Sequence, residues 1–161
     1  MGIIANYQET TDEVLETFMD IDAIGDAQDN DDIEICDLDK MWDALHFVLT
    51  GVSSSEPIKN NPFSEAVVGV ASIEGVEEFI SYTEKGRIKD IVFALDHFDI
   101  EKAMENFSMK ECKKANIYPD IWNYEEETDE IKEELMDYFQ NLKDFYKKIL
   151  EVNGNVMVTI Y

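Results

Sequence analysis

The chain has 161 residues, enough for one domain with a substantial core, and 45% of them are hydrophobic, which is typical of a globular protein. Its 37 acidic and 13 basic residues give a formal net charge of −24. Because nucleic acids and anionic membranes attract Lys and Arg and repel carboxylates, this charge excludes both as expected partners. It favours a basic partner, cations or simple solubility.

The acidic residues are concentrated in two stretches. Residues 1–39 contain 13 Asp and Glu and no Lys or Arg, and residues 125–134 contain seven acids and one lysine. The two stretches are distant in the chain, yet folding can place them on one surface. The acids that we expect a basic partner to contact are Asp29, Asp31, Asp32, Glu125 and Glu126.

The first third of the chain reads as a strand, a helix, a loop and a second helix. Residues 2–8 alternate like a short strand. Thr10 and Thr11 are expected to cap a helix, and residues 25–37 form an acidic loop that we expect to be weakly ordered. A helix over 38–49 follows.

That second helix, in the segment LDKMWDALHFVLTG, is strongly amphipathic. Its apolar face carries Leu38, Met41, Trp42, Leu45, Val48 and Leu49. Asp37 stands at the N-cap position, and Gly51 stands where a left-handed C-cap would end the helix. We expect Trp42 to be a buried anchor.

The middle of the chain is less regular. Residues 52–64 have the composition of a loop, and residues 65–71 predict a buried strand. Residues 76–82 fit either a helix or a strand; we favour the strand, because Thr83 is placed to stop it and to cap a helix over 84–97.

The last third is mainly helical. Short helices are predicted after Asp99 and after Ser108, which begins the capping-box pattern S-x-x-E. A long amphipathic helix is predicted from Thr128 to about Leu150, and a final strand from Val156 to Tyr161. We expect the first and last strands to pair in a small β-sheet covered by several helices, which makes residues 1–161 a single compact α+β domain.

The compartment that the chain suggests is the cytoplasm. Cys36 and Cys112 lack the CxxC spacing, so free thiols in a reducing environment are expected. The N-terminus has neither the positive charge nor the apolar stretch of a signal peptide, and no apolar run reaches membrane-spanning length. We expect a cytosolic monomer or weak homodimer.

Several segments together resemble the YfbM-like family, small bacterial proteins of uncharacterised function. The matching segments are MGIIANY at the start, LDKMWDALHFVLTG, Ala66–Gly69, IYPDIW at 117–122, YFQNLKDFY at 138–146 and the closing VMVTIY. The resemblance implies a compact, cytosolic single-domain protein and implies no activity. The acidic loop 25–37 departs from the family pattern.

One pair of side chains suggests a catalytic or ligand-binding site. His46 follows Asp43 by three residues and Trp42 by four, so the three are neighbours on one helix. An Asp43–His46 pair can act as a general base or bind a polar ligand, with Trp42, Tyr118 and Trp122 as aromatic walls. The alternative is a helix histidine that packs structurally near a helix C-terminus.

No metal or cofactor is expected. The loop from Asp26 to Asp37 has oxygen ligands at several positions of a calcium loop, but Asp31 replaces the turn glycine and Asp37 the final glutamate. Glycine-rich phosphate loops are absent from the sequence.

Two functions remain open. The first is an acidic protein-binding module, of the kind represented by toxin-neutralising immunity proteins, that docks a basic partner. The second is a small-molecule-binding protein or hydrolase that uses Asp43 and His46 beside an aromatic pocket. We prefer the first, and so a non-enzyme, because the charge excess is large while the catalytic case depends on one pair of residues.

Overall fold

The computed structural model describes residues 2–13, 35–72 and 79–161. Its strands are β1 (Ala5–Thr10), β2 (Ile35–Asp39), β3 (Ala71–Ser72), β4 (Phe79–Thr83) and β5 (Asn155–Ile160). Its helices are α3 (Trp42–Thr50), α4 (Pro62–Val68), α5 (Lys85–Asp96), α6 (Ile100–Glu105), α7 (Met109–Lys114), the single 3-10 turn η1 (Glu125–Glu127) and α8 (Thr128–Val152).

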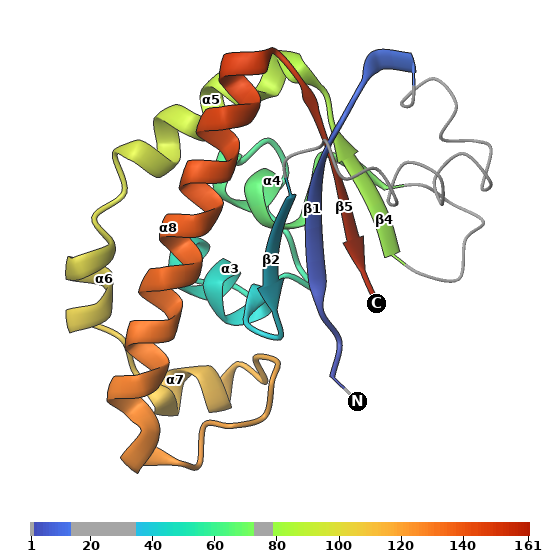
Figure 1. Ribbon diagram of the computed structural model, residues 1–161. Coiled ribbons are helices and arrows are strands. Elements are labelled where there is room, and N and C mark those ends of the chain that lie inside the picture. Colours follow the sequence, from blue (N-terminus) through green and yellow to red (C-terminus); the bar gives the residue numbers. More distant parts are fainter. Residues whose placement is uncertain (1, 14–34, 73–78) are drawn as a thin grey trace.

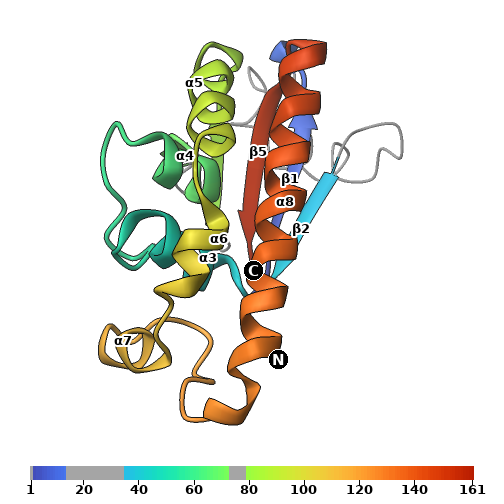
Figure 2. The same cartoon turned by 90° about the vertical axis from the view of Figure 1, so that its left-hand side faces the viewer.

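The strands form one antiparallel sheet in the order β2-β1-β5-β4-β3. The last strand of the chain therefore lies at the centre, where Val158 is opposite both Tyr7 of β1 and Ser81 of β4. Figure 1 shows the labelled helices gathered on one side of this sheet. Figure 2 shows α8 running along it, with α5, α4 and α3 beside α8. The fold is α+β, as the sequence predicts.

The main core lies between α8 and the sheet. The buried residues of α8 recur at helical spacing and are Ile131, Leu135, Phe139, Leu142, Phe145, Tyr146 and Ile149. They join one cluster with Tyr7 of β1, Leu38 of β2, and Val156 and Val158 of β5. Each large apolar side chain buried in this way contributes roughly 1.5–3 kcal/mol.

Helix α4 is short, yet it lies in the interior, and every residue from Ser64 to Val68 is buried. Its start follows from two adjacent residues. Asn61 accepts hydrogen bonds from the N–H groups of Phe63 and Ser64, and Pro62 occupies the first helical position, where its missing N–H costs nothing.

The C-terminal end of α4 is held by hydroxyl groups from three other elements. The last carbonyls of a helix have no partner within the helix, and buried ones need a donor. Three hydrogen bonds of 2.6 Å supply it, from Tyr146 of α8 to the Ala66 carbonyl, from Tyr7 of β1 to that of Val67 and from Ser81 of β4 to that of Val68. We call these bonds the three hydroxyl caps.

The structure corrects two predicted elements. Residues 65–71, predicted as a buried strand, belong mostly to α4, because Asn61 and Pro62 begin a helix and the hydroxyl caps satisfy its end. Residues 35–39, predicted as the end of a loop and the start of a helix, form β2. Leu38 faces the core from this strand, Asp37 is a strand residue, and the helix begins only at Trp42.

The other predicted elements within the described residues are confirmed, with small shifts, except that Thr83 is the last residue of β4 and the N-cap of α5 is Glu84. β4 and α5 occupy the segments predicted for them, Asp99 and Ser108 cap α6 and α7, and Asn153 ends α8 in a left-handed conformation. The first strand begins at Ala5 and extends to Thr10. Of the helix predicted after Thr11, only the first two residues, Asp12 and Glu13, are described, and both are helical; residues 25–34 of the acidic loop lie outside the described residues. No helix within the described ranges is both long and apolar enough to cross a bilayer.

Replacing Tyr7 or Tyr146 by Phe removes one hydroxyl cap and leaves a buried carbonyl without a donor. We expect each change to lower the free energy of unfolding by about 1–3 kcal/mol. Urea unfolding measures this loss. Tyr124→Phe is the matched control, because Tyr124 is 51% exposed and its change should stay within about 0.5 kcal/mol. Equal stability of all three variants would contradict a stabilising role for the caps.

Candidate functional site

Helix α3 positions the two residues that the sequence singled out. Asp43 and His46 lie one turn apart, and both are buried, with 4% and 0% of their surface exposed. A buried carboxylate and a buried imidazole both need hydrogen-bond partners, so their partners indicate what each residue does.

Asp43 organises two loops. Its Oδ1 atom accepts hydrogen bonds from the backbone N–H of Ser54 at 2.8 Å and from the hydroxyls of Ser53 and Ser54 at 3.1 and 2.7 Å. Its Oδ2 atom accepts from the backbone N–H of Tyr118 at 2.8 Å. The carboxylate thus fastens the loop after α3 to the segment after α7.

His46 connects α3 to α4. The carbonyl of Val52 lies 2.8 Å from Nδ1 and can only accept, so Nδ1 carries the proton. Nε2 is then an acceptor, and the hydroxyl of Ser64, 2.9 Å away, donates to it. The same hydroxyl oxygen accepts the backbone N–H of Ile58 at 3.0 Å. Burial lowers the pKa of His46, against the opposing effects of Val52 and the Asp43 charge, so the neutral ring is favoured.

Asp43 and His46 were predicted to act as a pair, but in the structure each hydrogen-bonds to other residues. The partner of His46 is Ser64, which lies 18 positions later in the chain, on another helix, where no sequence motif indicates it. A serine that donates to a histidine resembles a nucleophile and its base. However, His46 has no exposed surface from which to pass a proton to a leaving group, so the geometry supports a structural bond.

The predicted aromatic residues lie in two environments. Trp122 is buried and donates from Nε1 to the Ile117 carbonyl at 2.7 Å. Trp42, expected to be buried, is only half-buried, and its Nε1 donates to the Ile3 carbonyl at 2.9 Å. Its ring lies 5.8 Å from that of Tyr118. Trp42 is the first residue of α3, one turn later than the predicted start, and contacts the N-terminal segment through Ile3.

Two of the predicted ligand-binding residues do line a cavity. Tyr118 and Trp122 border an open cavity of about 420 Å³, together with Asp120 and Lys113. His46 lies away from it, in the interior between α3 and α4. Of the four residues predicted to bind a ligand, Tyr118 and Trp122 line this cavity and Trp42 lies beside Tyr118, whereas His46 is enclosed elsewhere.

Of the predicted partner-binding acids, Glu125 and Glu126 are exposed in η1, at the start of the long helix. Asp29, Asp31 and Asp32 lie outside the described residues.

The cysteines are unreactive. Cys36 and Cys112 are free and buried, and burial raises the pKa of each thiol to about 12, so both stay protonated at neutral pH. Within residues 2–13, 35–72 and 79–161, no three potential metal ligands are grouped closely enough to hold an ion.

Comparison with known proteins identifies the family. The profile of the family described as "Domain of unknown function (DUF1877)" matches residues 1–159. The chain belongs to this family. It is 30% identical to "Protein YfbM" of Escherichia coli (strain K12), with 99% of this chain and 98% of that protein covered. The DUF1877 fold is also matched in a solved structure.

That structure is described as the crystal structure of a protein of unknown function, YfbM, from Escherichia coli. It superposes with a TM-score of 0.82 at 28% identity, and the match covers 98% of this chain and 99% of that chain. The predicted resemblance to the YfbM-like family is thus confirmed. Like its relatives, this DUF1877 protein is one of unknown function.

The lowered pKa of His46 predicts a pH dependence of stability. The folded protein favours the neutral ring more than the unfolded chain does, so the unfolded chain binds the proton more readily. This contribution is fully present above the ordinary pKa of 6.5 and is lost as the pH falls through the lower folded pKa. It is limited to about 1.4 kcal/mol per pH unit for one proton.

Urea unfolding of the wild type and of His46→Gln, from pH 8 to pH 5, tests this prediction. The wild type should lose stability below pH 6.5 more steeply than the variant, which has no imidazole to protonate. Parallel curves in that range would contradict the assignment of a neutral, buried His46.

Proposed function

We propose that this protein is an acidic protein-binding module that docks a basic protein partner. The observation that carries the proposal is that acids from two distant parts of the chain lie on one surface. This surface joins β2 to η1 and the first half of α8.

The acids of α8 share one helical face. Asp129, Glu133 and Asp137 follow each other at intervals of four, and Glu130 and Glu134 form the adjacent row. All five are exposed. The face lies opposite the apolar stripe of α8, so the carboxylates point away from the core.

Strand β2 adds further carboxylates to the same surface. Burial and then the neighbouring Asp39 raise the pKa of Glu134. Burial, Glu134, Asp39 and Asp37 raise the pKa of Tyr138 to about 12. The charges of Asp37 and Asp39 on β2 therefore lie within electrostatic reach of α8. The exposed acids of this face are Asp37, Asp39, Glu125, Glu126, Glu127, Asp129, Glu130, Glu133, Glu134 and Asp137, which we call the acidic surface.

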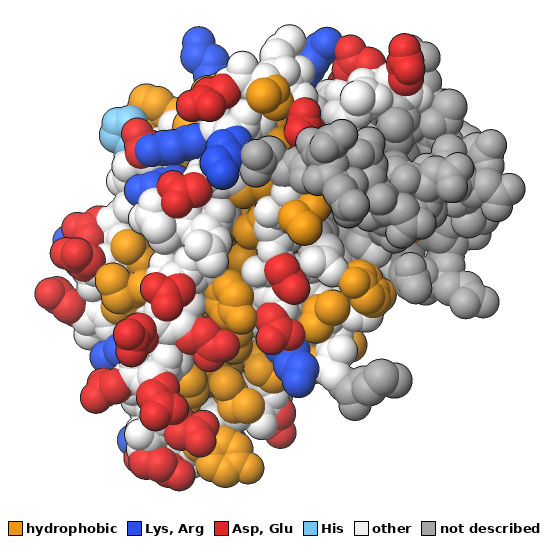
Figure 3. All heavy atoms as spheres, in the orientation of Figure 1, with side chains coloured by type: hydrophobic (Ala, Val, Ile, Leu, Met, Phe, Trp, Pro, Cys, Tyr) orange, Lys and Arg blue, Asp and Glu red, His pale blue; other side chains and the backbone are white. Residues whose placement is uncertain are grey.

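Three of the 13 basic residues are paired with acids elsewhere. The ion pairs found among the described residues join Lys85 to Asp12, Arg87 to Glu65 and Asp90, and Lys147 to Asp96. None of these acids belongs to the acidic surface. In Figure 3 most side chains visible over the lower part of this face that carry charge are Asp and Glu, while the larger group of Lys and Arg lies in the upper part among other acids. The negative field of the acidic surface is therefore left available to a partner.

Such a field suits rapid capture of a small cationic protein, because complementary charge raises association rates by 10- to 1000-fold, roughly. Toxin-neutralising immunity proteins work in this way, and the size and charge of the chain fit that type. A hydrolase built on Asp43 and His46 has less support, because His46 is enclosed and its partner is Ser64.

The test uses a partner isolated by pull-down and measures association rates at several salt concentrations. Reversing three charges of the acidic surface, with Glu130→Lys, Glu133→Lys and Asp137→Lys, should slow association about tenfold or more at low salt. The difference should shrink at physiological ionic strength, where the screening length is about 8 Å.

The control reverses three exposed acids outside the acidic surface: Glu56, Glu84 and Glu101. It changes the net charge by the same amount, so any difference between the two variants belongs to the surface itself. Equal rates for the two variants, or rates indifferent to salt, would refute the proposed docking surface.

A further inference from the structure

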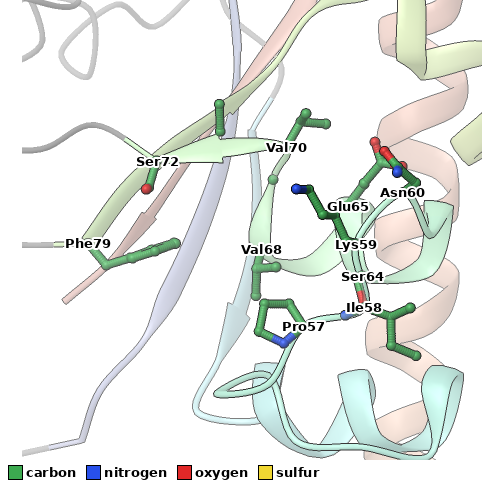
Figure 4. Close-up of a pocket in the computed structure, with 12 residues that line it drawn as sticks. Pro57, Ile58, Lys59, Asn60, Ser64, Glu65, Val68, Val70, Ser72 and Phe79 are labelled. Atoms are coloured by element: carbon green, nitrogen blue, oxygen red, sulfur yellow. The ribbon is translucent and has the colours of Figure 1, made fainter.

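A second cavity lies on a different part of the molecule, between the loop before α4, α4 itself, β3 and the start of β4. Its volume is about 440 Å³, within the range of small-molecule sites. Figure 4 shows the side chains that line it. Its apolar wall consists of Pro57, Ile58, Val68, Val70 and Phe79.

The buried polar groups of this cavity already have partners. Glu65 is 5% exposed, and its carboxylate is bound by the guanidinium of Arg87 through both Nε and Nη2. Ser64 donates to His46 and accepts from Ile58. The one carboxylate of the lining is thus neutralised, and the polar groups at the floor of the cavity do not need a hydrogen-bond donor from a ligand.

The polar groups at the mouth are different, because they are donors without partners. Lys59, Asn60 and Ser72 line the cavity, and within the described parts of the chain their side chains make no hydrogen bond or ion pair. In Figure 4 the amino group of Lys59 reaches into the space between α4 and Val70. Lys59 is thus the one uncompensated charge among the lining residues that the structure describes.

We propose that this cavity binds a small molecule with a single carboxylate and a compact apolar body. The carboxylate accepts hydrogen bonds from the Lys59 ammonium and the Asn60 amide, and the apolar body lies against Val70 and Phe79. The net charge of −24 opposes anions in general, so a singly charged ligand is favoured over phosphates or other multiply charged anions. This inference is independent of the acidic surface, which shares no residue with the cavity.

Amide chemical-shift titration by NMR tests the proposal with hexanoate as the probe. Hexan-1-ol and hexylamine are length-matched probes without the negative charge. Hexanoate should give saturable shifts at Lys59, Asn60, Val70 and Ser72, with weaker effects from the other two. Lys59→Ala should weaken hexanoate binding about tenfold by removing a charge-assisted bond, and Lys59→Arg should retain it.

Lys110→Ala is the control. Lys110 is an exposed residue of α7 outside the cavity, and its loss changes the net charge equally. Because Lys59 is exposed and its side chain makes no hydrogen bond or ion pair within the described residues, its variants should keep the wild-type melting temperature. Three results would each overturn the proposal: hexanoate binding that survives Lys59→Ala, binding of hexan-1-ol or hexylamine to the wild type as tight as that of hexanoate, or no saturable shift with hexanoate up to about 10 mM.

Discussion

The packing of the helices on the sheet depends on the hydrogen bonds that the last carbonyls of α4 accept. A helix of seven residues is too short to be stable alone, and three of its last carbonyls are buried. The hydroxyls of Tyr7, Ser81 and Tyr146 reach them from β1, β4 and α8, so one short helix fixes two strands and the longest helix relative to each other. Gly69 makes this possible just beyond the helix: its φ is 79°, and a Cβ there would collide with the Ser81 hydroxyl.

Two groups of polar side chains in the molecule contrast with each other. Those that touch α4, namely His46, Ser64, Glu65 and Arg87, are matched by a partner and serve to join elements. Those far from it, on the acidic surface, face solvent, and the ion pairs of the described residues leave them uncompensated. A matched buried group mainly determines shape, whereas an unmatched surface charge acts at a distance on whatever approaches. We therefore expect the function to depend on the surface charges that have no ion-pair partner.

The sequence predicted the features that depend on neighbouring residues and missed those that depend on tertiary contacts. The amphipathic period of α8 and the caps Asp99 and Ser108 are local, and they predicted their helices correctly. Residues 65–71 were predicted as a strand because a short apolar run fits either state. The adjacent Asn61-Pro62 is a helix-start signal, but its composition also fits a loop. The alternation of Cys36 and Leu38 likewise indicated β2, but Leu38 also fitted the helical period. The Ser64–His46 bond and the cavity beside Lys59 come from tertiary contacts, and no local pattern encodes them.

The central place of β5 has a consequence for how the chain assembles during synthesis. The sheet consists of the pair β1–β2 and the pair β3–β4, and only β5 hydrogen-bonds to both. Two-stranded pieces are marginal in water, so neither pair is expected to persist by itself. β5 follows the other four strands in chain order, so it leaves the ribosome after them. The nascent protein should therefore remain sensitive to protease until β5 has emerged and then become resistant in one cooperative step, which pulsed proteolysis of stalled chains would detect.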